Sequence, residues 1–313
     1  NYLTLPKGTT TQRGRGRGVW GGGTDGTNLA TIQYAELSSQ GNTIDFGDLI
    51  TGNNTVAAVS SSTRICFGGG REPSIVNRIQ FVEIATTSNA TDFGDLTVAR
   101  TFLDACSNET RGVFGSGSTP SVNVTIDFIT IATTGNAQDF GDSTKTATIS
   151  AAACASPTRG IFAGGYQPSS PKFDNVIEYI TIASAGNATD FGDMTTGRFN
   201  MTPGGCSSIT RGIFGGGKIL SPGTVMNNID FITIATTGDS TDFGDLTVAR
   251  QTCGACSNTL RGVFGGGNTA PSKIPTIDFI EIATTGNAND FGDMLSDIGD
   301  AAASSDSHGG LVE

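Results

Sequence analysis

Arginine and aspartate recur along this chain at nearly constant spacing, and both side chains can bind charged ligands. Each arginine opens a run such as Arg-Gly-Val-Phe-Gly-Gly, and each aspartate closes a copy of the tetrapeptide Asp-Phe-Gly-Asp. A ring of such groups would suit a charged ligand, because guanidinium and carboxylate groups form strong charge-assisted hydrogen bonds. Their recurrence in every copy favours a structural role, in which each arginine ties a turn to a neighbouring carboxylate or carbonyl. The arginines are Arg17, Arg64, Arg111, Arg159, Arg211 and Arg261, and the aspartates are Asp48, Asp95, Asp142, Asp193, Asp245 and Asp293.

Cysteine is the second residue type that could bind a ligand, in this case a metal ion. Four of the six cysteines lie five residues before a repeated arginine, and Cys253 forms the single Cys-x-x-Cys pair with one of them. A zinc site normally needs a second pair or histidines, and His308 is the only histidine. We therefore predict no metal site and expect free thiols that fill the core around a central axis. These four cysteines are Cys106, Cys154, Cys206 and Cys256.

No set of residues predicts catalysis. A Ser-His-Asp triad would depend on His308, which we expect at a frayed C-terminus. The carboxylates are abundant but periodic, which favours architecture over one acid–base pair. Asp-Phe-Gly-Asp also alternates its carboxylates along a strand and offers no oxygen cage for calcium. We predict a protein that is not an enzyme and needs no cofactor.

A repeat of about fifty residues must position these side chains. Each Asp-Phe-Gly-Asp copy follows an apolar run such as Thr-Ile-Asp-Phe-Ile-Thr-Ile, and the turns between runs are rich in Gly, Asn and Ser. Each unit thus predicts four short strands, a to d, and no helix. Four-stranded units at this period predict an all-β fold, a β-propeller, which we expect to form one domain over 1–313. The tetrapeptides occupy 45–48, 92–95, 139–142, 190–193, 242–245 and 290–293.

The strand count favours seven blades. Six repeats each supply four strands, and residues 301–313 continue in register with strands a and b of a further unit, with Gly309 at the arginine position. The segment Tyr2–Leu5 aligns with the end of an outer strand. We therefore expect both termini to complete a seventh blade, which would remove free sheet edges. The alternative is six blades with a separate C-terminal hairpin, or a piece of a longer array.

The repeat resembles the kelch family of β-propellers. The features that carry the resemblance are a strand b that ends in Gly-Gly, an aromatic residue in strand c, and the segments "DFGDLTVAR" at 92–100 and 242–250. Phe93 and Phe243 stand where that family usually has Trp. Recurring segments such as "CSNETRGVFG" are also similar to repeat proteins of marine bacteriophage virions, including tail-fibre-like proteins. A copper-oxidase branch of kelch propellers needs histidine and tyrosine ligands that this chain cannot supply.

The repeats differ most in the loops between strands b and c. These loops vary in length and hold most of the prolines, and we expect them on the same face as the connections from strand d to the next strand a. That face is the predicted recognition surface, because ligand contacts concentrate on loops that a rigid scaffold carries. The alternative is that these loops differ only because loop sequences vary readily, without any role in binding. Our candidate binding residues are Arg71, Tyr166, Lys172, Phe173 and Lys218.

Charge and composition limit the partners. The net charge of −11 disfavours nucleic acid, and the opening "RGRGRGVWGGG" matches strand b of the first repeat, with only Arg13 and Arg15 unexplained. No apolar run is long enough for a transmembrane helix. The first residue is Asn1 and not Met, which is consistent with a processed product or a fragment.

These observations and the resemblance lead us to expect a structural or attachment protein in a virion, present in several symmetric copies. It would bind a host-surface glycan or protein, or another virion protein. A cytoplasmic kelch-type adaptor is the alternative.

Overall fold

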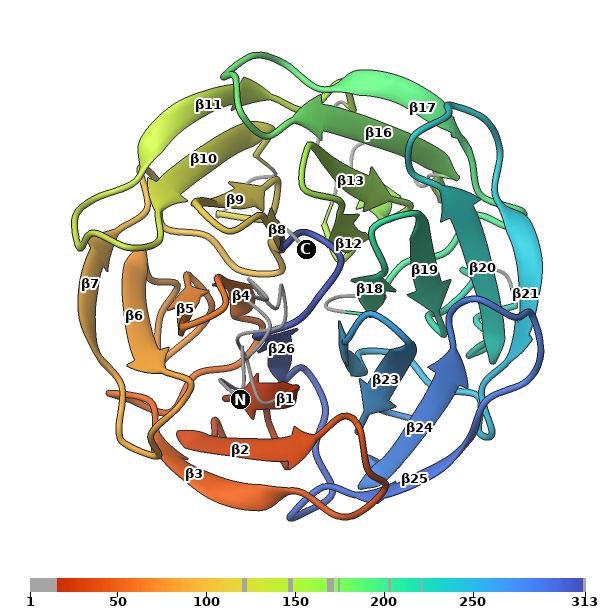
Figure 1. Ribbon diagram of the computed structural model, residues 1–313, viewed down its shortest axis with the longest axis horizontal. Coiled ribbons are helices and arrows are strands. Elements are labelled where there is room, and N and C mark those ends of the chain that lie inside the picture. Colours follow the sequence, from red (N-terminus) through yellow and green to blue (C-terminus); the bar gives the residue numbers. More distant parts are fainter. Residues whose placement is uncertain are drawn as a thin grey trace, which may run out of the picture.

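The computed structural model describes residues 16–119, 123–145, 149–167, 172–173, 175–201, 204–220 and 222–311. These residues form six antiparallel four-stranded sheets, arranged around a central axis as the blades of a propeller (Figure 1). The described residues contain no helix, and hence none that is long and apolar enough to cross a membrane. The prediction of a β-propeller with four-stranded blades is confirmed.

Each blade runs from an inner strand a to an outer strand d, and we number the blades from the one that contains Arg17. From blade 1 to blade 6, the inner strands are β26 (Ala302–Ser305), β4 (Ala57–Ser60), β8 (Asp104–Ser107), β12 (Ala152–Ala155), β18 (Gly205–Ser207) and β22 (Gly254–Ser257). The b strands are β1 (Arg17–Gly21), β5 (Arg64–Gly68), β9 (Arg111–Gly115), β13 (Arg159–Ala163), β19 (Arg211–Gly215) and β23 (Arg261–Gly265). The c strands are β2 (Thr31–Glu36), β6 (Arg78–Glu83), β10 (Thr125–Thr130), β16 (Val176–Thr181), β20 (Asn228–Thr233) and β24 (Thr276–Glu281). The d strands are β3 (Ile44–Asp48), β7 (Thr91–Asp95), β11 (Gln138–Asp142), β17 (Thr189–Asp193), β21 (Thr241–Asp245) and β25 (Asn289–Asp293).

The prediction of seven blades was wrong, because the described residues form six. Residues 302–305 are an inner strand as expected, but β26 pairs with β1 and completes blade 1. Residues 306–311 then form turns and no b strand, so Gly309 does not open a new blade. The segment Tyr2–Leu5, with Arg13 and Arg15, lies outside the described residues. The ring is thus closed by one late strand beside an early one.

The C-terminal turn crosses one end of the central channel, and His308 is not frayed. Its Nε2 lies 3.3 Å from the carbonyl oxygen of Ser60 in blade 2, and Gly309 donates its N–H to the carbonyl of Ser207 in blade 5 at 3.0 Å. The turn therefore contacts both sides of the ring, and the segment that follows β26 lies near its centre (Figure 1). Burial lowers the pKa of His308 to about 4.

The apolar core lies between successive blades. In blade 2, for example, Ile79 and Val82 of strand c are buried, and Phe93 of strand d meets the ring of Phe81 edge-on with centroids 5.9 Å apart. The same aromatic pair occurs in every blade, and such edge-to-face pairs add to the stability gained by burial. Trp20, the only tryptophan, is fully buried in the seam between blades 1 and 6, where its Nε1 donates to Gly254 at 3.0 Å.

In five of the six blades, the glycine after the repeated arginine makes room for a side chain of the preceding blade; in blade 2 that position is Ile65. A Cβ at Gly160 would lie 2.5 Å from Sγ of Cys106, and one at Gly212 would lie 2.6 Å from Sγ of Cys154. All six cysteines are buried and free, and burial raises the pKa of Cys106 to about 12. The thiols therefore act as small apolar groups between blades, where thiolate formation is unfavourable.

The Asp-Phe-Gly-Asp motif also joins one blade to the next. Its glycine has a positive φ and leaves no room for a side chain, since a Cβ at Gly94 would lie 2.4 Å from the carbonyl oxygen of Gly135 in the next blade. The N–H of the last aspartate, such as Asp95, donates to a side-chain oxygen of the next blade, here Asn136 at 3.1 Å. The aspartate carboxylates lie at the surface, so the main chain of the motif forms the repeated contact.

Buried ion pairs connect neighbouring blades at three of the six junctions, namely blades 2 and 3, blades 4 and 5, and blades 5 and 6. Each pair joins an arginine in the connection from strand d to strand a with an aspartate on strand c of the following blade. Both side chains are at most 1 % exposed, and burial lowers the pKa of Arg198 and raises that of Asp230 because desolvation outweighs their mutual attraction. The pairs, with their N–O distances, are Arg100–Asp127 (2.7 Å), Arg198–Asp230 (2.7 Å) and Arg250–Asp278 (3.1 Å).

At two of the three other junctions both positions carry uncharged residues. Between blades 1 and 2, Asn53 stands at the arginine position and Gln80 at the aspartate position; between blades 6 and 1 the residues are Ile298 and Gln33. Asn53 donates to the carbonyl of Gly69 at 2.9 Å, the carbonyl that corresponds to the one Arg100 reaches at Ser116. At these five junctions the buried position carries a carboxylate only where the connection supplies an arginine. Between blades 3 and 4 the buried Glu178 takes the aspartate position, and Lys145 is the cation of the connection, with Nζ donating to the carbonyl of Gly164 at 3.0 Å.

Candidate recognition faces

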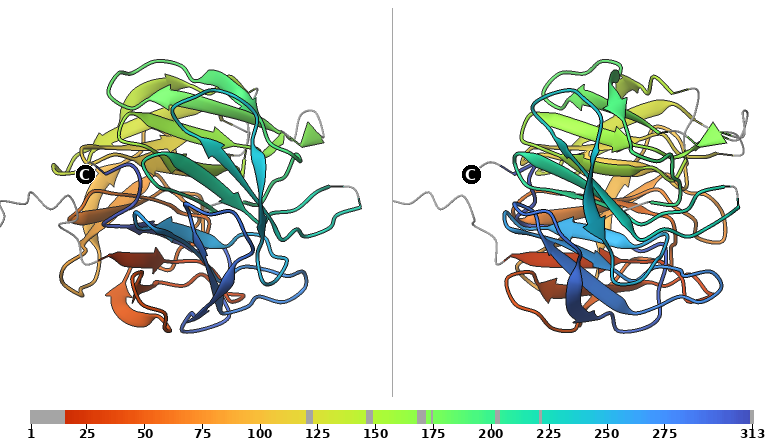
Figure 2. Two further views of the ribbon diagram at one scale, coloured as in Figure 1. Left: turned by 45° about the vertical axis from the view of Figure 1, so that its right-hand side comes forward. Right: turned by 90° about the vertical axis from the view of Figure 1, so that its right-hand side faces the viewer.

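The loops between strands b and c and the connections from strand d to strand a lie together, and we call this side the loop face. Figure 2 shows the loop after β19 projecting from this side, whereas the C-terminal segment after β26 lies on the other. In each blade the b–c loop forms a β-bridge with the connection that leads into that blade. The bridges are Thr24–Gly299, Asn54–Arg71, Thr101–Ser118, Ile149–Tyr166, Phe199–Lys218 and Gln251–Asn268.

The structure brings some of the predicted binding residues together. Tyr166 and Lys218 are half-buried and meet through Phe199, whose ring lies 5.5 Å from that of Tyr166 and whose main chain pairs with that of Lys218. Lys172 and Phe173 form β15 (Lys172–Phe173), which pairs with β14 (Tyr166–Gln167); their side chains lie outside the description. These four residues belong to blades 4 and 5.

Arg71 lies apart from that group, in blade 2. Its side chain is exposed, and its carbonyl accepts a hydrogen bond from Nδ2 of Asn28 at 2.8 Å. Its main chain also exchanges two hydrogen bonds with that of Asn54, so the loop itself is well anchored. The predicted residues therefore form one cluster and one separate position.

Sequence reasoning missed a ring of strained residues on the loop face. One non-glycine residue in each d–a connection has a φ between 53° and 60°, a left-handed conformation that costs on the order of 1–3 kcal/mol and often marks functional sites. Five of these residues donate an N–H to the carbonyl of the equivalent residue in the preceding blade, as Phe102 does to Thr55 at 3.3 Å. In blade 5 the donor is the next residue, Met201. The six are Thr55, Phe102, Ser150, Asn200, Thr252 and Asp300.

Polar side chains accompany this ring. Asn200 donates to Oε1 of Gln251 at 2.9 Å, and the buried Oγ1 of Thr252 has no hydrogen-bond partner among the described residues. Burial raises the pKa of the Asp300 carboxyl to about 6, although Lys273 favours its charged form. The connections from strand d to strand a thus hold amide, hydroxyl and carboxyl groups at or just below the loop face, groups that can form hydrogen bonds.

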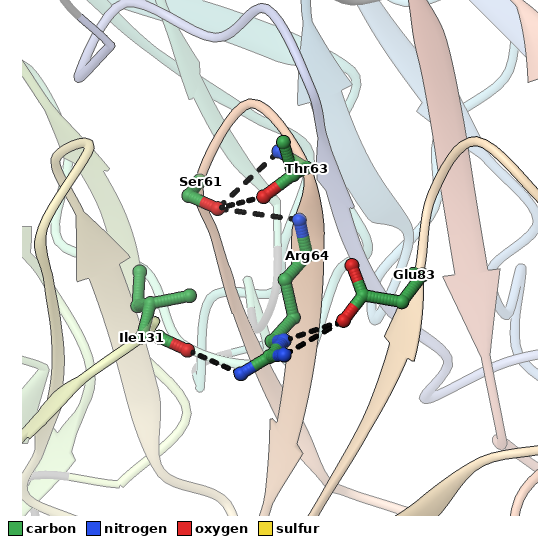
Figure 3. A network of polar contacts seen from close by, with 5 residues as sticks. All are labelled: Ser61, Thr63, Arg64, Glu83 and Ile131. Carbon is green, nitrogen blue, oxygen red and sulfur yellow. Dashed lines mark hydrogen bonds and ion pairs between the residues drawn. The ribbon is translucent and has the colours of Figure 1, made fainter. Parts of the chain in front are cut away.

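The turns between strands a and b and between c and d form the opposite side, which we call the turn face. Here each repeated arginine joins two blades. Figure 3 shows Arg64, whose Nη1 donates to the carbonyl of Ile131 in the next blade at 3.0 Å while Nε and Nη2 bind Glu83 of its own blade. The carbonyls that the six arginines reach, in blade order, belong to Ile84, Ile131, Ile182, Ile234, Ile282 and Ser38.

An aromatic ring supports each of these guanidinium groups. The Cζ atom lies 4.2 to 4.8 Å from the centroid of an aromatic ring on strand c, a distance at which cation–π attraction acts. The repeated aspartates do not pair with these arginines; the carboxylate partners are Glu36, Glu83 and Glu281, in blades 1, 2 and 6.

The central channel brings a serine and a histidine together without the geometry of a nucleophile and its base. Oγ of Ser107 lies 3.2 Å from Nε2 of His308, but Nδ1 of His308 accepts the N–H of Gly310 at 3.0 Å. In the neutral ring Nε2 then carries the proton and cannot accept one from Ser107. The space lined by Ser107, His308 and the inner strands is about 40 Å³, room for only a few water molecules.

Among the described residues, no group of three His, Cys, Asp or Glu side chains lies close enough together to hold a metal ion. A scan against protein-family models finds no match to this chain, and no curated protein matches it either.

Proposed function

We propose that this chain is a structural or attachment protein of a bacteriophage particle, built on kelch-like blades, which binds its target through the loop face without catalysis. The target is a host-surface glycan or another surface molecule. The observation that carries the proposal is the group formed by Tyr166, Phe199 and Lys218 on the loops of blades 4 and 5, where an otherwise regular scaffold varies most.

The chemistry of this group favours a carbohydrate. The rings of Tyr166 and Phe199 are half-buried and tilted by 39° to each other, so their edges and faces remain available for sugar C–H groups. Asn200 and Gln251 lie next along the chain from Phe199 and Arg250, and supply amides that can hydrogen-bond sugar hydroxyls.

The test is binding of the purified chain to an array of bacterial surface glycans. Tyr166→Ala and Phe199→Ala are each expected to lower binding at least about tenfold, the loss of roughly one buried aromatic contact. Arg71→Ala, on the same face but in blade 2, is the matched control and should bind as the parent does. Thermal unfolding of each variant verifies the fold.

The same variants distinguish the alternatives. Loss of particle assembly with unchanged glycan binding would assign the loop face to another virion protein. A soluble monomer that binds no glycan, is absent from particles and co-purifies with a cytosolic partner would refute the virion proposal in favour of a cellular kelch-type adaptor.

A further inference from the structure

The repeated arginines fall into two classes, although their placement is the same in all six blades. In blades 1, 2 and 6, strand c ends in a glutamate that binds the Nε edge of the guanidinium, at N–O distances of 2.7 to 3.0 Å. In blades 3, 4 and 5, strand c ends in an exposed threonine, and no carboxylate of the described residues pairs with the arginine. The threonines, in the order of Arg111, Arg159 and Arg211, are Thr130, Thr181 and Thr233.

The three unpaired guanidinium groups are held ready for a carboxylate. Nη1 of each donates to a carbonyl of the next blade at 2.9 Å, and the Cζ atom lies 4.7 to 4.8 Å from an aromatic ring. These are the contacts that also orient Arg64, whose Nε and Nη2 bind Glu83. The protein therefore shows, in its own blade 2, which group fits the edge that Arg111 leaves open.

We propose that Arg111, Arg159 and Arg211 form a binding site on the turn face for an extended acidic peptide segment of a partner protein. Each guanidinium edge takes one carboxylate in the place that a glutamate occupies in the other blades. The site is independent of the proposed glycan site, since it lies on the opposite face of the ring.

The spacing of the blades defines the peptide. Packed sheets lie about 10 Å apart. A peptide in the polyproline II conformation rises about 3.1 Å per residue and has about three residues per turn, so its every third side chain lies on the same face and matches equivalent edges in neighbouring blades. Blades 3, 4 and 5 are consecutive, so one peptide with three acidic residues at this period reaches all three arginines.

The charge of the whole chain favours such a ligand over a dense polyanion. A net charge of −11 repels polymers such as nucleic acid or heparin, in which every unit is charged. A peptide with one carboxylate per blade adds little long-range repulsion and still forms three charge-assisted hydrogen-bonded pairs.

The test is an NMR titration of the intact chain with a synthetic peptide that carries glutamate at three positions, each three residues apart. The arginine Nε–Hε signals of Arg111, Arg159 and Arg211 are expected to shift, and those of Arg64 and Arg261 to stay unchanged because their edges are occupied. A peptide with glutamine at the same positions should shift none of them.

Substitutions that copy the other blades provide the decisive variant. In Thr130→Glu/Thr181→Glu/Thr233→Glu an internal carboxylate fills each open edge, and affinity for the peptide should fall about tenfold or more, at roughly two- to fivefold per edge. The variant should fold, because blades 1, 2 and 6 already use this pair, and its unfolding midpoint checks that. Conversely, Glu83→Thr opens an edge beside blade 3 and should tighten binding of a four-glutamate peptide by about two- to fivefold.

Three results would overturn the proposal: equal binding of the glutamine peptide, unchanged affinity of the triple variant, or tighter binding of heparin or DNA than of the peptide at physiological salt. The last result would assign the arginines to a dense polyanion. None of these results bears on glycan binding at Tyr166, so failure of this proposal is distinguishable from failure of the proposed function.

Discussion

Replacing both members of a buried ion pair should harm this protein far less than replacing either one. In Asp127→Gln the guanidinium of Arg100 stays buried without its carboxylate, and in Arg100→Asn the carboxylate of Asp127 stays buried without its cation. Both side chains are fully buried and 2.7 Å apart, so each single change should lower the free energy of unfolding by about 3–5 kcal/mol. The double variant creates the neutral combination that Asn53 and Gln80 already form between blades 1 and 2.

The double variant should lose only about 1–2 kcal/mol, because asparagine is smaller than arginine, so the coupling between the two positions is at least about 4 kcal/mol. The assay is equilibrium unfolding in guanidinium chloride, followed by circular dichroism and by the fluorescence of Trp20. Coincident transitions would validate two-state free energies.

The matched control is the reverse exchange, Asn53→Arg/Gln80→Asp, which introduces an ion pair where the protein has none. Either of its single changes should cost more than the double change. The reasoning is refuted if the two losses at Arg100 and Asp127 simply add, or if each is below about 1 kcal/mol.

Three further predictions follow from individual contacts. Burial raises the pKa of Asp300 to about 6, so the fold disfavours its charged carboxylate. Asp300→Asn should therefore stabilise the protein by about 1–3 kcal/mol above pH 7, and this gain should disappear as the pH falls to about 4. Thermal unfolding measured across this pH range checks it. Because burial lowers the pKa of His308, its imidazole binds a proton more tightly in the unfolded chain than in the fold. The free energy of unfolding should therefore fall by up to about 3 kcal/mol as the pH is lowered from 7 to 4, and His308→Gln should remove this part of the pH dependence. A Cβ at Gly160 would meet Sγ of Cys106 at 2.5 Å, so Gly160→Ala should cost about 1–3 kcal/mol in denaturant unfolding, and adding Cys106→Ala should restore part of it; an unchanged midpoint in the single variant would contradict this packing.

The repeat predicted the blade well because each strand carries its own local signal. The β-branched and aromatic residues of strand c, the Gly-Gly end of strand b and the Asn-rich turns all lie within a few residues of the structure they specify. The cysteines before the repeated arginines were recognised as apolar groups for the same reason. They lie on a strand whose neighbours are small.

The number of blades depends on the pairing of β26 with β1, two strands from opposite ends of the chain, and no local sequence pattern predicts that pairing. We assigned a complete first repeat, although the residues before Arg17 lack the small-residue pattern of an inner strand. Ala302–Ser305 has that pattern, and this difference was the available signal.

Two other features could be recognised only in the folded structure: the buried ion pairs between blades and the left-handed residues of the loop face. The partners Arg100 and Asp127 lie 27 residues apart and on different blades. The left-handed residues on the loop face gave no signal, since Thr55 or Phe102 carries none of the usual preference of glycine for positive φ.

Pairing of β26 with β1 has a consequence for biosynthesis. The last strand of blade 1 begins 285 residues after Arg17, because 302 − 17 = 285. At roughly 5–20 residues per second, a ribosome takes about 15–60 s to make that interval. During this time the inner edge of β1 lacks its partner, and an open strand edge can pair with another nascent chain. The ring can thus close only after translation has passed Ser305, and holding β1 apart from other chains until then is a task for chaperones.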